Sequence, residues 1–126
     1  MTADDGPTIT IRLLLGADGA RFGPGKADLL DGIATEGSIA GAGRRMGMSY
    51  RRAWSLVDEM NSAFATPLVT SARGGAQGGG AALTADGRAV LAHYRAMEAK
   101  LRRAGAADIA GITTRLRAPG ADAGDG

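Results

Sequence analysis

Two helix breaks that lie close together constrain the fold of this chain more than any other feature. Gly37 is followed at once by Ser38, and Gly47 is followed by Met48 and Ser49. Glycine adopts the left-handed backbone that ends many helices, and a serine side chain accepts a hydrogen bond from the first turn of the next helix. The pattern therefore predicts three consecutive helices joined by two tight turns.

Apolar residues at helical spacing surround these breaks. The first helix is predicted from Lys26 up to Gly37, the second over 39–46 and the third from Tyr50 to Phe64. The second consists mostly of small residues, which let helices cross closely. An apolar stripe at helical spacing faces the core. The residues predicted on the core faces are Ala27, Leu29, Leu30, Ile33 and Ala34 in the first helix, and Ala53, Trp54, Val57, Met60, Asn61 and Phe64 in the third.

Short apolar runs flank the three helices and predict β-strands. Residues 8–15 alternate apolar and polar side chains before three leucines, which is typical of a strand. Residues 68–71 and 81–83 predict a hairpin, and its tip at 74–80 holds five glycines. A long helix is predicted over 85–103. The fold class is mainly α: a winged helix-turn-helix with a short N-terminal strand, a β-hairpin wing and a long C-terminal helix.

One domain for DNA binding and dimerisation is expected over residues 9–103, with flexible segments at 1–8 and at the Gly/Ala-rich 104–126. A domain of this size is marginally stable alone, so a homodimer is expected. A 4-3-4 spacing of apolar side chains in the last helix predicts a seam for a second helix. The predicted dimerisation residues are Val90, Tyr94, Met97 and Leu101.

Charge is distributed unevenly along the chain. Residues 38–103 carry ten basic and four acidic side chains, whereas residues 1–37 carry three basic and six acidic ones. A basic middle in a chain of net charge +2 predicts one face that meets a polyanion. The plainer alternative is a solvated charged surface.

Composition excludes several classes of site. The chain has no cysteine and one histidine, His93, so disulfides, thiolate metal sites and histidine-cluster metal sites are not expected. No catalytic triad is recognisable, and we expect neither an enzyme nor a cofactor. The acidic N-terminus does not match a secretory signal, and the apolar run Leu13–Leu15 is far shorter than a membrane span. A cytoplasmic protein is therefore expected.

The second and third helices match a helix-turn-helix, whose second member enters the major groove of DNA. Arg51, Arg52, Ser55 and Glu59 fall on the side of the third helix away from its apolar face. Arginine binds guanine or phosphate through two N–H groups, and glycines in a wing permit close approach to a sugar-phosphate backbone. The predicted DNA-binding residues are Ser38, Ser49, Tyr50, Arg51, Arg52, Ser55, Arg73, Gly75, Gln77 and Gly78.

Structural alternatives remain beside this prediction. The same helices fit an all-α domain with surface arginines, and the glycine-rich tip fits a hairpin without contacts. A phosphate-binding P-loop is not expected, because Ala81 rather than lysine follows the glycines. Trp54 is predicted to lie in the core with Val57 and Phe64, and Tyr50 at the boundary of the apolar face.

Several motifs together resemble the ModE family of molybdate-responsive transcriptional regulators. They are the run 37–54 with its Ser-Tyr-x-x-Ala-Trp segment, Glu59-Met60-Asn61, the glycine-rich 74–81 and Leu83-Thr84. The resemblance is to the N-terminal domain, which is related to the LysR-type DNA-binding domain, and covers roughly residues 9–103. It implies a winged helix-turn-helix that dimerises through its long last helix with help from the N-terminal segment. It also implies DNA contacts at Ser49, Tyr50 and Arg51 or Arg52, and at the wing around Arg73 to Gly80.

The resemblance does not extend to the molybdate-binding region of those regulators. About 23 residues follow the last predicted helix and show no strand pattern, so no molybdate site is expected in this chain. We expect a sequence-specific, dimeric DNA-binding regulator of transcription. One alternative is a protein-interaction module that dimerises through the last helix without its own DNA contacts. Another is an oxyanion-responsive factor whose sensor is a partner chain.

Overall fold

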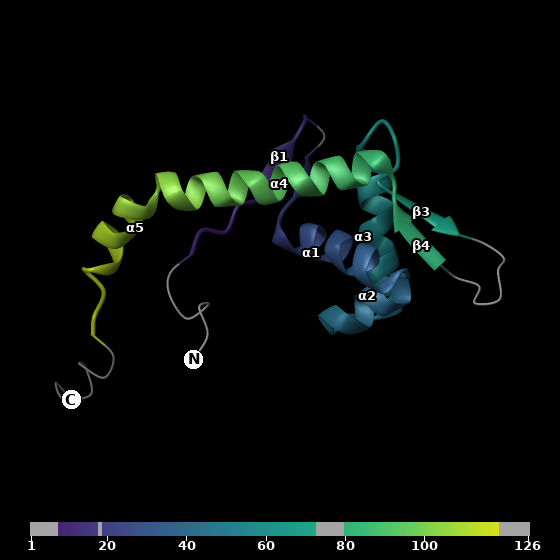
Figure 1. Cartoon of the computed structure of the whole chain (residues 1–126), viewed down its shortest axis with the longest axis horizontal. Coiled ribbons are helices and arrows are strands. Elements are labelled where there is room, and N and C mark those ends of the chain that lie inside the picture. Colours follow the sequence, from purple (N-terminus) through teal and green to yellow (C-terminus); the bar gives the residue numbers. More distant parts are fainter. Residues whose placement is uncertain (1–7, 18, 73–79, 119–126) are drawn as a thin grey trace. The chain divides into compact units, whose positions relative to one another are not determined.

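The computed structural model describes residues 8–17, 19–72 and 80–118 (Figure 1). Thr10–Ala96 form one compact unit, and the described residues outside that range belong to a smaller second unit. In order along the chain, the elements are β1 (Leu13–Leu15), β2 (Ala20–Phe22), α1 (Pro24–Glu36), α2 (Ile39–Met46), α3 (Tyr50–Ala63), β3 (Val69–Ala72), β4 (Gly80–Leu83), α4 (Ala85–Ala104) and α5 (Ala106–Thr113).

The three central helices begin and end where glycine and serine predict. Gly37 and Gly47 follow α1 and α2 with φ angles of 76° and 71°. Ser38 Oγ accepts a hydrogen bond of 2.9 Å from an amide in the first turn of α2, and Ser49 Oγ accepts one of 3.0 Å from the amide of Arg52 in α3. The prediction of three consecutive helices is confirmed.

Small residues set the spacing of these helices. A Cβ atom placed on Gly32 of α1 would lie 3.0 Å from that of Ala42 in α2, and one on Gly43 would lie 3.2 Å from a Cβ of α3. Gly32 is buried at this close contact with α2. Ala34 was predicted to face the core, but it is exposed. The first helix also begins at Pro24, earlier than predicted, since proline is favoured in a first turn where its missing N–H is not needed.

Apolar side chains from these helices, from both hairpins and from the first part of α4 form the core of the larger unit. Phe22 of β2 is 2% exposed and packs edge-to-face on Tyr94 of α4, with 5.3 Å between ring centroids. The Tyr94 hydroxyl donates a hydrogen bond to the carbonyl of Ile11. Arg95 Nη2 lies 2.7 Å from Oδ1 of Asp28 in α1. These contacts fix the first part of α4 against α1 and the N-terminal hairpin.

The N-terminal hairpin is an unexpected element. The strand predicted over 8–15 is confined to Leu13–Leu15, and it pairs antiparallel with β2, which was not predicted. Leu13 lies opposite Phe22 in this pairing. A hairpin of two three-residue strands has few main-chain hydrogen bonds, and the buried side chain of Phe22 stabilises it by packing on Tyr94.

The second hairpin is the predicted wing. β3 pairs antiparallel with β4, with Val69 opposite Leu83. The amide of Ala81 in β4 donates a 2.9 Å hydrogen bond to the carbonyl of Gly37, between α1 and α2. Three helices and a hairpin attached in this way form a winged helix-turn-helix, so the predicted fold class is confirmed.

The main chain of Leu68 joins the wing to the start of α4. Its carbonyl accepts hydrogen bonds from the Thr84 amide at 2.9 Å and from Thr84 Oγ1 at 3.2 Å. The Thr84 hydroxyl oxygen in turn accepts from the amide of Gly87, as a helix cap does. A Cβ atom on Gly87 would lie only 2.1 Å from the Leu68 carbonyl oxygen, so this close contact requires glycine.

The smaller unit contains the last part of α4 and the helix α5. Gly105 donates its amide to the carbonyl of Leu101 at 2.8 Å, and α5 begins at the next residue. This helix was not predicted, because the sequence around it is rich in glycine and alanine. Ile112 in α5 and Leu116 just after it are 67% and 68% exposed.

The described residues form neither a membrane-spanning helix nor a cluster of metal-binding side chains. No helix in this part of the chain is both long and apolar enough to cross a membrane. No group of three or more histidine, cysteine, aspartate or glutamate side chains is placed there to hold a metal ion.

Candidate nucleic-acid interface

The first turn of α3 is exposed, as the helix-turn-helix prediction requires. Tyr50 is 57% exposed, and Arg51, Arg52 and Ser55 are also exposed. Ser49 satisfies only one amide of this turn, that of Arg52. A helix start with exposed amides and positive dipole attracts anions such as phosphate. Nothing within the described residues buries this end of the helix.

The two arginines of this turn carry charge that no described carboxylate neutralises. Among the described residues, neither Arg51 nor Arg52 lies within ion-pair distance of a carboxylate. By contrast, Arg45 at the end of α2 lies 3.7 Å from Glu36, and Lys26 lies 3.1 Å from Glu59. Positive charge is therefore concentrated at the start of α3.

The prediction that Trp54 belongs to the core is wrong. Its side chain is 36% exposed and forms an edge-to-face pair with Tyr50, with 6.3 Å between ring centroids. Leu56, which was not predicted to be buried, takes a core position at 7% exposure. The two aromatic rings therefore form a partly exposed apolar surface beside the arginines of α3.

Of the remaining predicted DNA contacts, only Ser38 lies within the described residues. Ser38, at the start of α2, is half-buried and its Oγ is occupied by the cap hydrogen bond. The predicted contacts in the wing lie outside the described residues; they are Arg73, Gly75, Gln77 and Gly78. The base of the wing is described as far as Ala72 on one strand and from Gly80 on the other.

Asn61 fixes the base of the wing to α3. Its Oδ1 accepts hydrogen bonds from the amides of Leu68 at 2.8 Å and Val69 at 3.1 Å. Its Nδ2 donates to the carbonyl of Val69 at 3.0 Å. One side chain thus satisfies three main-chain groups and sets the position of β3 relative to α3. The sequence placed Asn61 on the correct side of the helix but did not predict this role.

The predicted dimerisation seam needs one correction. Tyr94 is 2% exposed and packs on Phe22 of its own chain, so its side chain is not available to a second subunit. Val90, in the same unit, is half-buried. In the smaller unit Met97 is half-buried and Leu101 is 41% exposed. A role for these three residues in dimerisation stays a prediction.

Known proteins similar to this chain support the resemblance that its motifs predict. No family model matches the sequence. The chain is 46% identical over 87 residues to the molybdenum-pterin-binding protein MopB of Rhodobacter capsulatus. It is 45% identical over 76 residues to the molybdenum transport protein ModE of Azotobacter vinelandii, and 41% identical over 71 residues to the DNA-binding transcriptional dual regulator ModE of Escherichia coli K12. The chain is a homologue of the ModE and Mop proteins.

The homology covers only part of those proteins. The matched segments span 69%, 60% and 56% of this chain, but 32%, 28% and 27% of MopB and the two ModE proteins. The fold is also similar to that of a chain in the crystal structure of a complex between CbnR_DBD and DNA. That similarity has a TM-score of 0.55 and 21% sequence identity, and covers 69% of this chain and 94% of the other. It supports the fold assignment made above.

Proposed function

We propose that this chain is a sequence-specific DNA-binding domain that regulates transcription as a homodimer. The observation that carries the proposal is the exposed first turn of α3, where Arg51 and Arg52 have no carboxylate partner within the described residues. In a winged helix-turn-helix this turn is the part that enters the major groove. Homology to a DNA-binding transcriptional dual regulator supports the same conclusion.

Arg51 and Ser55 are placed to contact bases in this proposal. They lie one turn apart on the side of α3 opposite its buried residues, and both are exposed. Arg52 lies further round the helix and is placed for a phosphate. An arginine on a guanine edge discriminates between sequences, whereas an arginine on phosphate adds affinity for all of them.

A dimer would present two α3 helices to one DNA molecule. Their spacing would then match half-sites about 34–36 Å apart, or a multiple of this distance. The exposed apolar side chain of Leu101 supports a role for α4 in joining two subunits. Arg51 and Arg52 of both subunits together bring four positive charges to the DNA. If these four charges displace bound counterions from the DNA, the binding affinity is expected to fall about 100-fold between 50 and 200 mM salt.

The test is a DNA-binding titration by fluorescence anisotropy at two salt concentrations, with DNA selected from a random pool by the protein itself. Arg51→Ala and Arg52→Ala are each expected to weaken binding about 5- to 100-fold, with unchanged thermal stability. Arg103→Ala, which removes an exposed arginine from α4, is the matched control. Binding that ignores salt, or that the control weakens as much as Arg51→Ala does, would contradict the proposal.

The main alternative is a protein-interaction module without DNA contacts. It predicts that no DNA is enriched from the pool, and that assembly is lost with Leu101→Asp but not with Arg51→Ala. Sedimentation of the same variants measures the assembly directly.

A further inference from the structure

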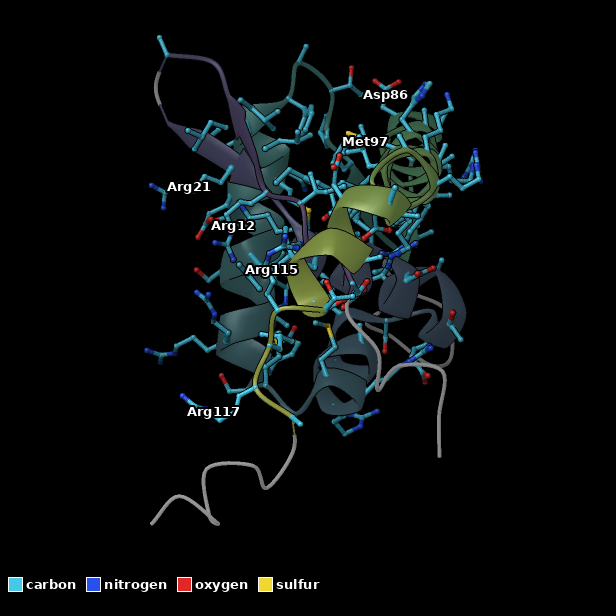
Figure 2. The ribbon with its side chains drawn as sticks, turned by 90° about the vertical axis from the view of Figure 1, so that its left-hand side faces the viewer. Arg12, Arg21, Asp86, Met97, Arg115 and Arg117 are labelled. Atoms are coloured by element: carbon cyan, nitrogen blue, oxygen red, sulfur yellow. The ribbon has the colours of Figure 1, made fainter. Side chains whose placement is uncertain are left out.

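The N-terminal hairpin carries arginines on its outer face. Side chains alternate between the two faces of a strand, so Arg12, just ahead of β1, shares a face with Leu14. Arg21 of β2 lies directly opposite Leu14 in the antiparallel pairing. Arg12, Leu14 and Arg21 are all exposed, while Phe22 points into the core. Figure 2 shows Arg12 and Arg21 extending from this hairpin.

These arginines line a pocket together with α3. The pocket has a volume of about 310 Å³, and its charged lining consists of Arg12, Arg21, Lys26, Arg52 and Glu59. Met48 and Leu56 contribute apolar surface, and the start of α1 forms part of the wall. The N-terminal hairpin and the adjacent start of α1 therefore meet α3, which is distant in sequence, and together they bring four positive charges and one negative charge to one place.

The single carboxylate in the pocket already has a partner. Lys26 Nζ lies 3.1 Å from Glu59 Oε1 and donates a 2.8 Å hydrogen bond to the carbonyl of Arg21. Only 14% of the Lys26 side chain is exposed, so this ion pair is held in place. The pair leaves three guanidinium groups around the pocket, and within the described residues none of them is paired with a carboxylate.

Three like charges around one cavity repel each other, and an anion in the cavity removes that repulsion. A guanidinium group presents a rigid fork of N–H donors that matches the oxygens of a phosphate. The pocket also includes Arg52, which belongs to the exposed first turn of α3. An anion bound there would lie on the flank of the helix that is proposed to enter the groove.

We propose that the pocket formed by Arg12, Arg21 and Arg52 binds a phosphate group, that of the DNA backbone beside the groove occupied by α3. The inference rests on the proposed function for its DNA source. The same chemistry fits free inorganic phosphate, which is the second source that the experiment separates. The N-terminal hairpin is then a phosphate clamp on the side of α3 that bears Arg52 and Glu59.

The experiment compares Arg21→Gln and Arg12→Gln with Arg103→Gln, which removes the same charge outside the pocket. Each pocket variant is expected to weaken binding about 5- to 10-fold on every DNA sequence. The slope of log affinity against log salt concentration is expected to become shallower by about one for each phosphate-binding arginine removed from the complex, and each substitution removes one arginine from each subunit of the dimer. The ranking of DNA sequences stays unchanged, because a phosphate contact carries no sequence information.

Arg21→Lys separates charge from folding effects. This variant keeps the positive charge but lacks the two-pronged donor. Its salt slope is expected to equal that of the wild-type chain, and its affinity for DNA is expected to lie between those of the wild-type chain and Arg21→Gln. A second arm titrates inorganic phosphate into the full chain by calorimetry at low salt. Heat that appears with the wild-type chain and is lost in Arg21→Gln identifies a phosphate site even where DNA binding is unaffected.

The outcomes distinguish this inference from the proposed function. If the wild-type chain binds no DNA, the proposed function fails, and the phosphate arm alone decides about the pocket. If the wild-type chain binds DNA but Arg21→Gln behaves like Arg103→Gln, and inorganic phosphate gives no heat, the pocket inference is overturned while the proposed function stands.

Discussion

Replacing Asn61 tests whether one side chain holds the wing to α3. Asn61→Leu keeps a similar volume but removes three hydrogen bonds, two to the amides of Leu68 and Val69 and one to the carbonyl of Val69. Each such bond contributes about 0.5–1.5 kcal/mol net. The groups are only partly buried, so water replaces some of the loss, and we expect a decrease of about 2–3 kcal/mol in the free energy of unfolding.

That decrease corresponds to a melting temperature lower by roughly 10–20 °C for a unit of this size. Thermal unfolding followed by far-UV circular dichroism measures it. Asn61→Asp keeps the oxygen that accepts from both amides but turns a carboxylate oxygen toward the Val69 carbonyl, so the free energy of unfolding is expected to decrease here too. Ser62→Ala, at the exposed next position, is the control and is expected to change nothing measurable.

Hydrogen exchange makes the test specific to the wing. The amides of Leu68 and Val69 are expected to lose protection in Asn61→Leu more than amides of α1 do, because their acceptor is removed. A melting temperature within a few degrees of that of Ser62→Ala, with both amides still protected, would refute the conclusion that Asn61 anchors β3.

Three further predictions follow from single contacts. Gly87→Ala brings a Cβ atom to 2.1 Å from the Leu68 carbonyl oxygen and is expected to destabilise the protein by about 1–3 kcal/mol in urea unfolding. Gly25→Ala, which meets nothing within 4 Å, should cost nothing, so equal losses would contradict the packing argument. Ser49→Ala removes the cap of α3 and is expected to cost about 1 kcal/mol by the same method, a prediction that an unchanged midpoint would disprove. Trp54 is partly exposed on α3, so its fluorescence is expected to change when DNA binds, and Trp54→Ala should cost less than the 3–5 kcal/mol typical of a buried aromatic residue. A larger cost without a change in fluorescence would place Trp54 back in the core.

Local chemistry explains why the helices could be predicted. The Gly37 and Gly47 breaks and the Ser38 and Ser49 caps act through neighbouring residues, so their effect is visible in a short stretch of sequence. The exposed arginines of α3 could be predicted for the same reason, since the opposite side of that helix is apolar. The DNA contacts themselves remain predictions.

What could not be predicted depends on distant contacts. β2 has three residues, and it is held there by Phe22 packing on Tyr94, which is remote in sequence. The same contact removes Tyr94 from the predicted dimer seam. Trp54 lies roughly 100° round the helix from the centre of the buried face, where spacing alone does not separate boundary from core. The pocket lined by Arg12, Arg21 and Arg52 required the N-terminal hairpin, the start of α1 and α3 to meet, which no local pattern reveals.

The main chain of Leu68 belongs to three attachments at once. Its amide is held by Asn61 of α3, its carbonyl is held by Thr84, and the backbone of α4 at Gly87 lies against that carbonyl without room for a side chain. A displacement of the first turn of α4 therefore cannot leave β3 in place, and β3 cannot shift without straining its attachment to α3. A signal that tilts α4 would therefore reach both the wing and α3 through the backbone of this residue.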